Sequence, residues 1–284
     1  MQRWTALLLM AAGVLVVAII IARAGRGGAD FDQVFAVDGQ SRPASAPGQR
    51  APVLIELFTS EGCSSCPPAD ELLRRLAETQ PVAGAEVIAL EQHVDYWNRL
   101  GWADPFSAPE FSARQGDYAA YFNSSGVYTP QMIVDGQTEF PGGNTERARA
   151  AIVAAAQRPK ATISLARNGA TQPEGIPLSV RVEQVPAVAA GDTVEVLLAL
   201  TEDALRTDVP RGENAGRKLA HAAVVRALSS LGQINAPGGP AFVAQPVVAL
   251  STRWQLKNLR AVVFVQERNS RRVLGAAALR LATE

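Results

Sequence analysis

The sequence predicts an α/β domain over residues 52–159, followed by an all-β, sandwich-like domain over residues 160–284. In the first range, short apolar runs alternate with segments of helical periodicity, which is typical of strand–helix–strand units. In the second range, about seven short apolar or alternating runs are separated by Pro, Gly, Asn and Asp, which is typical of an antiparallel sandwich. A long apolar segment near residue 1 predicts an additional N-terminal hydrophobic helix.

That N-terminal segment covers residues 1–28. The run from Trp4 to Ala22 contains no charged side chain and is flanked by Arg3 and Arg23. At about 1.5 Å per residue, a helix of this length reaches nearly across a hydrocarbon core of about 30 Å. We therefore expect a transmembrane anchor, with a cleaved signal sequence as the alternative because signal peptides normally have a shorter apolar region. Both interpretations place the remaining chain outside the cytoplasm, in a periplasmic or extracytoplasmic location, with the anchor in the inner membrane.

Residues 29–51 are rich in Gly, Pro, Ser and Ala, and we expect them to be a linker. The chain has 27 Lys+Arg and 27 Asp+Glu, so its formal net charge is zero. Because no basic run is present either, we expect no nucleic-acid partner. The expected partners are the membrane, through the N-terminal helix, and other exported proteins.

The first half of the α/β domain has the pattern of a strand, a helix and a second strand. The apolar run 53–58 predicts a buried parallel strand, and residues 64–79 place Ala and Leu side chains at helical spacing. Pro67 and Pro68 fall in the first turn of that helix, where the missing N–H group has no helical partner to lose. Residues 87–90 predict the second strand.

The second half predicts a helix, two strands and a final helix. A helix is expected from Ser107, because Ser-Ala-Pro-Glu has the pattern of a capping box. Residues 131–134 predict a third strand, which Asp-Gly at 135–136 turns into a fourth strand at 138–140. A third helix is expected over 145–157. Together these elements make a mixed four-stranded sheet with three helices.

The all-β region shows little helical periodicity. The segment 218–228 fits a strand or a helix equally well. The runs lie at 161–166, 178–185, 193–201, 218–228, 243–250, 259–266 and 273–281.

The chemistry of the sequence is concentrated in its only two cysteines, Cys63 and Cys66. A disulfide framework would scatter cysteines along the chain, whereas one close pair indicates redox or metal chemistry. The pair follows a strand and begins a helix, where free N–H groups and the helix dipole stabilise a thiolate. We expect Cys63 to attack a substrate and Cys66 to resolve the mixed disulfide.

The segment Tyr128-Thr129-Pro130 directly precedes the third strand. With the strand–CxxC–helix unit, it resembles the thioredoxin superfamily. This resemblance implies that Pro130 is a cis-proline facing the cysteines and that the backbone of Thr129 contacts the substrate. Glu56 resembles the buried acid that assists the resolving thiol. Gly62 and Ser64-Ser65 depart from thioredoxin itself, which leaves the redox potential and the direction of electron flow open.

A second resemblance is more extensive. The chain is similar to the domain-of-unknown-function 1223 family of exported bacterial proteins over roughly residues 52–284. The matching segments do not identify a substrate. They are Phe58 to Asp70, His93 to Trp97, Tyr128 to Gln131, Arg211 to Asn214 and Val224 to Arg226.

These features predict a thiol–disulfide oxidoreductase that acts on the thiols or disulfides of an exported protein. No organic cofactor is expected, because the Cys63–Cys66 disulfide is itself the redox centre. The alternative is a copper-binding or copper-delivery protein that uses Cys63, Cys66 and His93, since thiolate and imidazole ligands suit Cu(I). A purely structural disulfide and a noncatalytic adaptor are further alternatives. A structural zinc site would need four ligands from two different regions of the chain.

Overall fold

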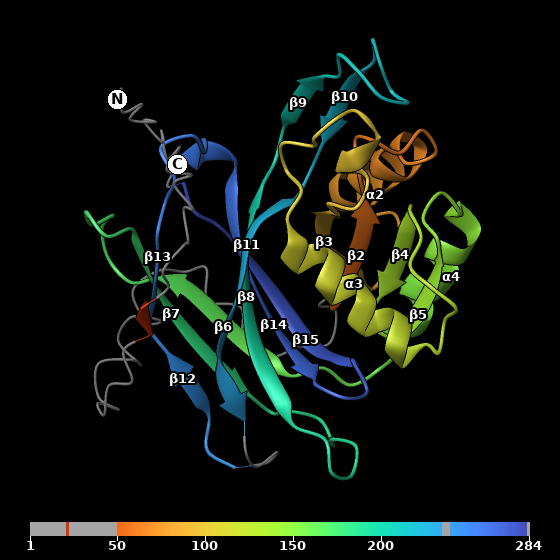
Figure 1. Ribbon diagram of the computed structural model, residues 1–284. Helices are drawn as coiled ribbons and strands as arrows, with labels where there is room; N and C mark the ends of the chain where they lie inside the picture. Colours follow the sequence, from red (N-terminus) through yellow and green to blue (C-terminus); the bar gives the residue numbers. More distant parts are fainter. Residues whose placement is uncertain (1–20, 23–49, 235–238, 283–284) are drawn as a thin grey trace, which may run out of the picture.

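The computed structural model describes residues 21–22, 50–234 and 239–282, and Figure 1 shows them as a mixed α/β structure. Most of the predicted anchor and linker lie outside these residues. Ile21–Ala22, at the end of the predicted span, form strand β1 and pair antiparallel with β13 (Pro246–Val248). No helix among the described residues has the length and apolar character needed to cross a bilayer.

Three helices and four strands follow one another in the predicted order between residues 51 and 156. Their bounds are β2 Ala51–Thr59, α2 Pro67–Thr79, β3 Ala85–His93, α3 Pro109–Tyr121, β4 Gln131–Val134, β5 Thr138–Pro141 and α4 Thr145–Ala156. The predicted capping box at Ser107 is wrong, because Ala108 is the N-cap of α3 and makes no side-chain cap. Ser107 instead donates through Oγ to the carbonyl of Asp104. The cap of α4 is Asn144, whose side chain accepts from the N–H of Arg147.

The four strands pair in the order β3-β2-β4-β5. Strands β2 and β3 are parallel, whereas β2–β4 and β4–β5 are antiparallel. This confirms the predicted mixed arrangement, but the sheet is larger than expected. It continues through β11 to give eight strands in the order β15-β14-β8-β11-β3-β2-β4-β5. The sheet therefore takes strands from both sides of the predicted boundary at residue 159.

Residues 160–284 supply strands and, among the described residues, no α-helix. Their strands are β6 Thr162–Arg167, β7 Ile176–Glu183, β8 Val194–Glu202, β9 Leu205–Asp208, β10 Lys218–His221, β11 Val224–Ile234, β12 Phe242–Ala244, β13 Pro246–Val248, β14 Leu259–Glu267 and β15 Val273–Arg280. The ambiguous segment 218–228 is thus extended, with β10 and β11 separated by a bend at Ala223, where φ is 56°.

The all-β part has two packed sheets and a separate hairpin. One face of β8, β14 and β15 packs against the smaller sheet around β7, and an apolar cluster fills the space between them. Strands β9 and β10 form an antiparallel two-stranded hairpin. In Figure 1 this hairpin rises from the large sheet beside α2.

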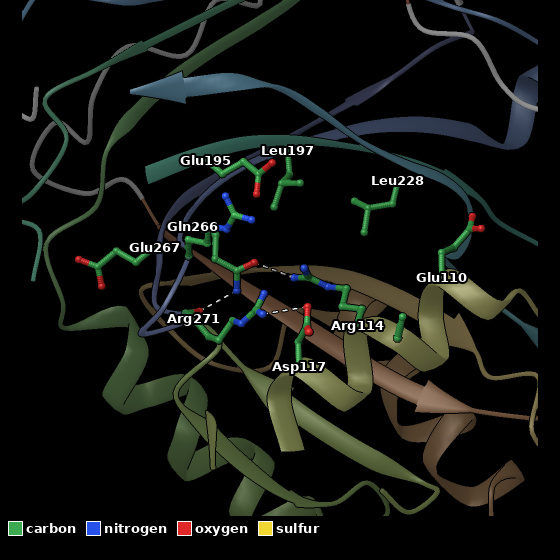
Figure 2. A pocket seen from close by; sticks show the side chains of 11 residues that line it. Glu110, Arg114, Asp117, Glu195, Leu197, Leu228, Gln266, Glu267 and Arg271 are labelled. Atoms are coloured by element: carbon green, nitrogen blue, oxygen red, sulfur yellow. Dashed lines mark hydrogen bonds and ion pairs between the residues drawn. The ribbon is translucent and has the colours of Figure 1, made fainter. Parts of the chain in front are cut away.

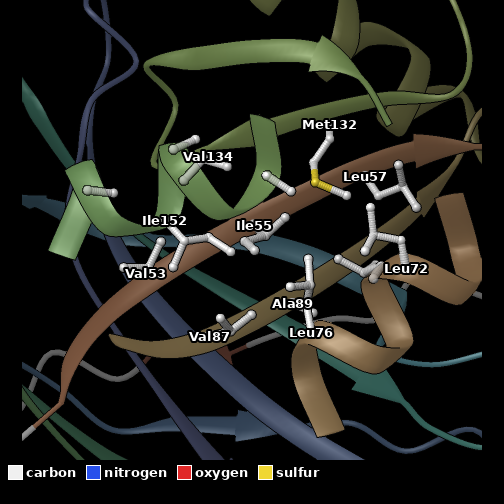
Figure 3. Packing of buried hydrophobic residues seen from close by; sticks show 14 of the residues in the cluster. Val53, Ile55, Leu57, Leu72, Leu76, Val87, Ala89, Met132, Val134 and Ile152 are labelled. Atoms are coloured by element: carbon white, nitrogen blue, oxygen red, sulfur yellow. The ribbon is translucent and has the colours of Figure 1, made fainter. Parts of the chain in front are cut away.

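The two faces of β2 bury different clusters, because side chains alternate across a strand. Val53, Ile55 and Leu57 face the cluster that α2 and α4 cover, where Leu72, Leu76 and Ile152 pack against them (Figure 3). Leu54 and Phe58 face the other side, where they pack in two smaller clusters with Phe111 and Tyr118 of α3. This alternation determines which helix each polar residue of β2 meets.

The turn between β4 and β5 allows a test of the packing. Gly136 has φ +68°, and a Cβ there would lie 1.8 Å from the carbonyl oxygen of Arg271. We expect Gly136→Ala to lower the free energy of unfolding by about 2–4 kcal/mol, because a left-handed backbone and a backbone clash add. Gly84→Ala is the matched control, since Gly84 has φ +80° with open space around it. It should cost only about 1 kcal/mol in urea unfolding. Equal losses in the two variants would contradict this account.

Candidate functional site

The cysteine pair lies where β2 leads into α2. Cys63 and Cys66 form a disulfide with an S–S distance of 2.17 Å and a Cα–Cα distance of 5.4 Å. Cys66 is the N-cap residue of α2, and its carbonyl accepts from the N–H groups of Ala69 and Asp70. Both cysteines are fully buried, whereas the two serines between them are exposed. The helix therefore begins directly after the second cysteine, and the positive end of its dipole lies at the disulfide.

The Thr129–Pro130 peptide bond is cis. The indole Nε1 of Trp97 donates to Thr129 Oγ1 over 2.8 Å. The Cβ of the same Trp97 lies 3.1 Å from where a Cβ on Gly62 would stand. Trp97 thus connects the residue before Cys63 to the residue before Pro130. It also leaves little room for a side chain at position 62.

Pro130 in turn lies near the first turn of α2. Its carbonyl accepts from the N–H of Gly142 over 2.9 Å. A Cβ on Gly142 would lie 3.1 Å from the Cβ of both Pro130 and Ala69. Since Ala69 is three residues beyond Cys66, these contacts place Pro130 beside the first turn of the helix that follows the cysteine pair.

A loop of the all-β part covers the cysteine pair. This cover loop, residues 209–217, joins β9 to β10. Within it, fully buried Asn214 donates through Nδ2 to the carbonyl of Glu61 over 2.8 Å and to that of Cys63 over 2.9 Å. Glu213 Oε2 accepts from the N–H of Ser64 over 3.0 Å, and hydrogen bonds from the side chain and backbone of Ser64 lower the pKa of the Glu213 carboxyl. In the sequence, this loop can be recognised only because residues 211–214 resemble the family, and that resemblance implies no role for it.

Beneath the cover loop lies a histidine–carboxylate cluster of Glu61, Glu91, His93, Asp104 and His221, all buried. His93 Nδ1 lies 2.7 Å from Asp104 Oδ2, and His221 Nδ1 lies 2.7 Å from Glu91 Oε1. His221 Nε2 lies 3.2 Å from Glu61 Oε1. The two rings contact each other edge to face, with centroids 4.8 Å apart. From the sequence, His93 is the only one of these residues predicted as a candidate metal ligand. His221 is 128 positions away in the chain, and only the fold brings the two rings close.

The electrostatics of this cluster favour charged histidines. Burial alone would lower the pKa of His93, but the carboxylate of Asp104 raises it to about 9. In the same way the carboxylate of Glu91 raises the pKa of His221 to about 11. For Glu91, burial opposes ionisation, yet the nearby imidazolium of His221 lowers its pKa to about 2. At neutral pH the cluster therefore holds buried opposite charges in contact.

Asp70 is a second buried acid and belongs to the cysteine helix. Its N–H donates to the carbonyl of Cys66, and its Oδ1 accepts from the hydroxyl of Thr59 over 2.6 Å. Burial, together with repulsion from Glu91, raises its pKa to about 7. Asp70 can therefore exchange a proton near neutral pH. The burial of Asp70 could have been predicted from the sequence, because position 70 belongs to the same helical face as Leu73, which packs against the sheet.

Glu56, the acid predicted to assist Cys66, lies on the opposite face of β2, toward α3. Its carboxylate accepts from Arg114 at 2.6 Å (Nε) and 2.9 Å (Nη2). Tyr118 OH and Gln92 Nε2 also donate to it. Burial would raise its pKa, but the Arg114 guanidinium holds it below the usual range. The strand alternation that buries Ile55 and Leu57 toward α2 gives Glu56 this structural ion pair instead of a contact with the cysteine helix.

A pocket of about 260 Å³ lies between α3 and strands of the large sheet, as Figure 2 shows. Two contacts join side chains of this lining. Arg271 meets Asp117 at 2.8 Å, and Arg114 donates to Gln266. None of the residues that line this pocket belongs to the cysteine pair, the cover loop or the histidine–carboxylate cluster.

The alternative copper ligands are not brought together as a set. Within the described ranges, the one group of three His, Cys, Asp or Glu residues whose ligand atoms lie within 4.8 Å of one another is Glu91, His93 and His221. Cys63 and Cys66 are bonded to each other and do not belong to it.

Comparison with known proteins supports the fold. A family model described as "Protein of unknown function (DUF1223)" matches residues 54–266. The crystal structure of an Agrobacterium tumefaciens protein is similar with a TM-score of 0.61 and 24% identity, covering 83% of this chain and 97% of that one. HBP35 of Porphyromonas gingivalis is similar with a TM-score of 0.61 and 16% identity, covering 83% of this chain and 79% of the other. No curated protein matches the chain.

The buried carboxyl of Asp70 leads to a prediction about pH. Since its folded pKa of about 7 lies above the ordinary 3.8, the native state loses stability as pH rises through that interval. In metal-free buffer, Asp70→Asn should remove this loss and raise the free energy of unfolding at pH 8 by on the order of 3 kcal/mol. Asp208→Asn, at an exposed position, should change it by less than about 0.5 kcal/mol. Urea unfolding between pH 4 and 8 measures both, and a variant less stable than wild type at pH 8 would refute the assignment.

The cover loop leads to a second prediction. Asn214→Ala removes two hydrogen bonds to the backbone around Cys63. The two hydrogen bonds together contribute a net value of about 1.4 kcal/mol. We therefore expect dithiothreitol to reduce the Cys63–Cys66 disulfide about tenfold faster in the variant than in the wild type. Asn269→Ala, at an exposed site in the β14–β15 turn, is the control and should leave the rate unchanged. Thiol labelling followed over time measures the rate, and an unchanged rate in Asn214→Ala would show that the loop does not limit access.

Proposed function

Since this chain belongs to the DUF1223 family, whose description assigns no activity, we propose its function from the site itself. We propose that residues 52–159 form a thioredoxin-like domain and that the protein is an extracytoplasmic thiol–disulfide oxidoreductase. The observation that carries this proposal is the Cys63–Cys66 disulfide at the N-terminus of α2, with the Thr129–Pro130 segment beside it. The partner we propose is an exported protein that carries thiols or a disulfide.

The position of the cysteines supports thiolate chemistry. The thiolate is the form that attacks a disulfide, and the positive end of a helix dipole stabilises it. A structural role fits the pair less well, because a disulfide between residues so close in sequence closes a short loop and gains little stability from chain entropy.

The reaction balances without an added cofactor. In the reductive direction, the Cys63 thiolate attacks a substrate disulfide, forms a mixed disulfide and releases one substrate thiolate. The Cys66 thiolate then attacks the Sγ of Cys63 and releases the second substrate thiolate. Two electrons pass from the cysteine pair to the substrate, whose two thiolates take up the two protons that the cysteines lost. The oxidative direction is the exact reverse of these steps.

Asp70 is the acid we assign to proton transfer at Cys66. It is buried one helical turn beyond that residue, and its pKa of about 7 suits uptake and release of a proton near neutral pH. Glu56 does not enter this scheme, because Arg114 and Tyr118 already hold its carboxylate.

The proposed location outside the cytoplasm rests on two features. The apolar run from Trp4 to Ala22 has the length of a membrane span. A disulfide persists in an oxidising compartment such as the periplasm and is kept reduced in most cytosolic proteins. The anchor itself lies almost entirely outside the described residues, and we propose it from the sequence alone.

Substitution of each cysteine separates the two thiol roles. With a peptide disulfide as substrate and a thiol reductant in excess, Cys63→Ser should lose at least 100-fold in exchange rate, because the attacking sulfur is gone. In a separate reaction without the reductant, the Cys66→Ser protein should accumulate a mixed disulfide with the substrate at Cys63, which nonreducing electrophoresis and mass spectrometry detect. Ser64→Ala is the matched control within the same motif and should keep exchange within about threefold of wild type, because its side chain is exposed.

Two outcomes would contradict the proposal. Exchange at the wild-type rate in Cys63→Ser would show that the pair does not carry the reaction. A Cys66→Ser protein that forms no mixed disulfide at Cys63, in the assay or in cells, would show that Cys63 is not the attacking residue.

A further inference from the structure

One ring nitrogen in the histidine–carboxylate cluster lacks a hydrogen-bond partner. His93 is fully buried, and its Nδ1 is used by Asp104 at 2.7 Å. Its Nε2 makes no hydrogen bond within the described part of the chain. Glu91 Oε1 lies 3.4 Å from it. Since an unsatisfied buried polar atom costs about 1–3 kcal/mol, this nitrogen calls for an explanation.

The unpaired nitrogen points toward two other potential ligands. Glu91 Oε1 lies 3.4 Å from His93 Nε2 and 2.7 Å from His221 Nδ1, so two nitrogens flank one carboxylate oxygen. One ligand atom from each of the three residues lies within 4.8 Å of the other two. Glu91 and His93 are alternate residues of one strand, with their side chains on the same face, and His221 ends a neighbouring strand.

The remaining ring nitrogens are held by carboxylates outside this group. His93 Nδ1 meets Asp104, and His221 Nε2 meets Glu61 at 3.2 Å. Glu61 is itself fixed by the indole N–H of Trp102 at 2.7 Å. Metal-binding histidines almost always donate their second ring N–H to such a carboxylate, which orients the ring and raises its basicity. Both histidines of the chain therefore have the outer contacts of metal ligands.

We propose that Glu91, His93 and His221 bind a divalent metal ion through His93 Nε2, His221 Nδ1 and a carboxylate oxygen of Glu91. Two imidazoles and one carboxylate form a donor set that suits Zn²⁺. Metal binding through these nitrogens displaces a proton from each histidine, so the dication takes over the positive charge beside the buried carboxyl groups of Glu91 and Asp104. The site is separate from the disulfide and contains no sulfur ligand.

Metal at this position joins two parts of the chain. Glu91 and His93 belong to β3, whereas His221 belongs to β10, whose hairpin carries the cover loop. The ion therefore fixes the hairpin against the sheet while Asn214 contacts the backbone of Cys63. This role is independent of the proposed exchange reaction, which needs the two cysteines and no metal.

Zinc binding by the full-length protein tests the site. After treatment with a chelator and dialysis, the wild-type protein should take up one Zn²⁺ per chain, measured by elemental analysis, and its unfolding temperature should rise. His93→Gln and Glu91→Gln should each weaken binding at least tenfold. The Cys63→Ser/Cys66→Ser double variant is the control and should bind Zn²⁺ as tightly as wild type.

Several results would overturn the proposal. They are failure of the wild type to bind Zn²⁺, unchanged binding in both ligand variants, or a cobalt-substituted protein whose near-ultraviolet spectrum has a thiolate charge-transfer band. If the ligand variants do not fold, Asp104→Asn keeps all three ligands and removes an outer contact. It should then weaken binding about 10–100-fold, and unchanged binding in that variant would also overturn the proposal.

Discussion

A single pair of residues joins the two halves of the large sheet. Strand β11 runs parallel to β3 at Val224 and Glu91, and the N–H of Glu91 donates to the carbonyl of Ala223. Without this contact the outer edge of β3 would carry unpaired backbone groups, which native sheets usually cover or pair. Because β10 immediately precedes β11, the same contact also positions the β9–β10 hairpin over the cysteine pair. The environment of the disulfide thus depends on a junction whose β11 side follows Cys63 by more than 150 residues along the chain.

The interior around this junction is polar on both faces of the sheet. Toward α3, Arg114 and Glu56 form a bidentate ion pair that Gln266 of β14 connects to the all-β part. Toward the hairpin, two histidines lie among three carboxylates. Buried ion pairs contribute little net stability, because desolvation offsets much of the Coulomb attraction. Their directional contacts do restrict how the two parts of the chain can fit together, since removal of one partner leaves a buried charge.

Local patterns in the sequence were sufficient for the elements of the first part. Apolar runs, the prolines of the first turn of α2 and the Asp135-Gly136 turn predicted strands and helices that the structure contains in the same order. The position of the CxxC pair between β2 and α2 follows from these local signals. The face of Glu56 could also have been found, because its neighbours Ile55 and Leu57 have the opposite parity and are the residues that face α2.

Contacts between distant segments could not be predicted in this way. Nothing local marks β10 and β11 as continuations of the first sheet, and an eleven-residue segment there fits either periodicity. The pairing of His221 with Glu91 and the contact of Asn214 with Cys63 both follow from that non-local arrangement. The predicted capping box at Ser107 failed for a local reason. Ser107 has the right spacing in the sequence, but its hydroxyl hydrogen-bonds to the Asp104 carbonyl and the Asn98 amide instead.

The cover loop holds the segment around the disulfide through hydrogen bonds to its main chain. Asn214 binds the carbonyls of Glu61 and Cys63, and Glu213 binds the N–H of Ser64. The side chains of Ser64 and Ser65 remain exposed to solvent. Under the proposed function, the two residues between the cysteines can therefore be exchanged, and the reduction potential of the pair altered, while these main-chain hydrogen bonds to the loop are kept. In that proposal, the reduction potential of the disulfide and the access to it can change independently.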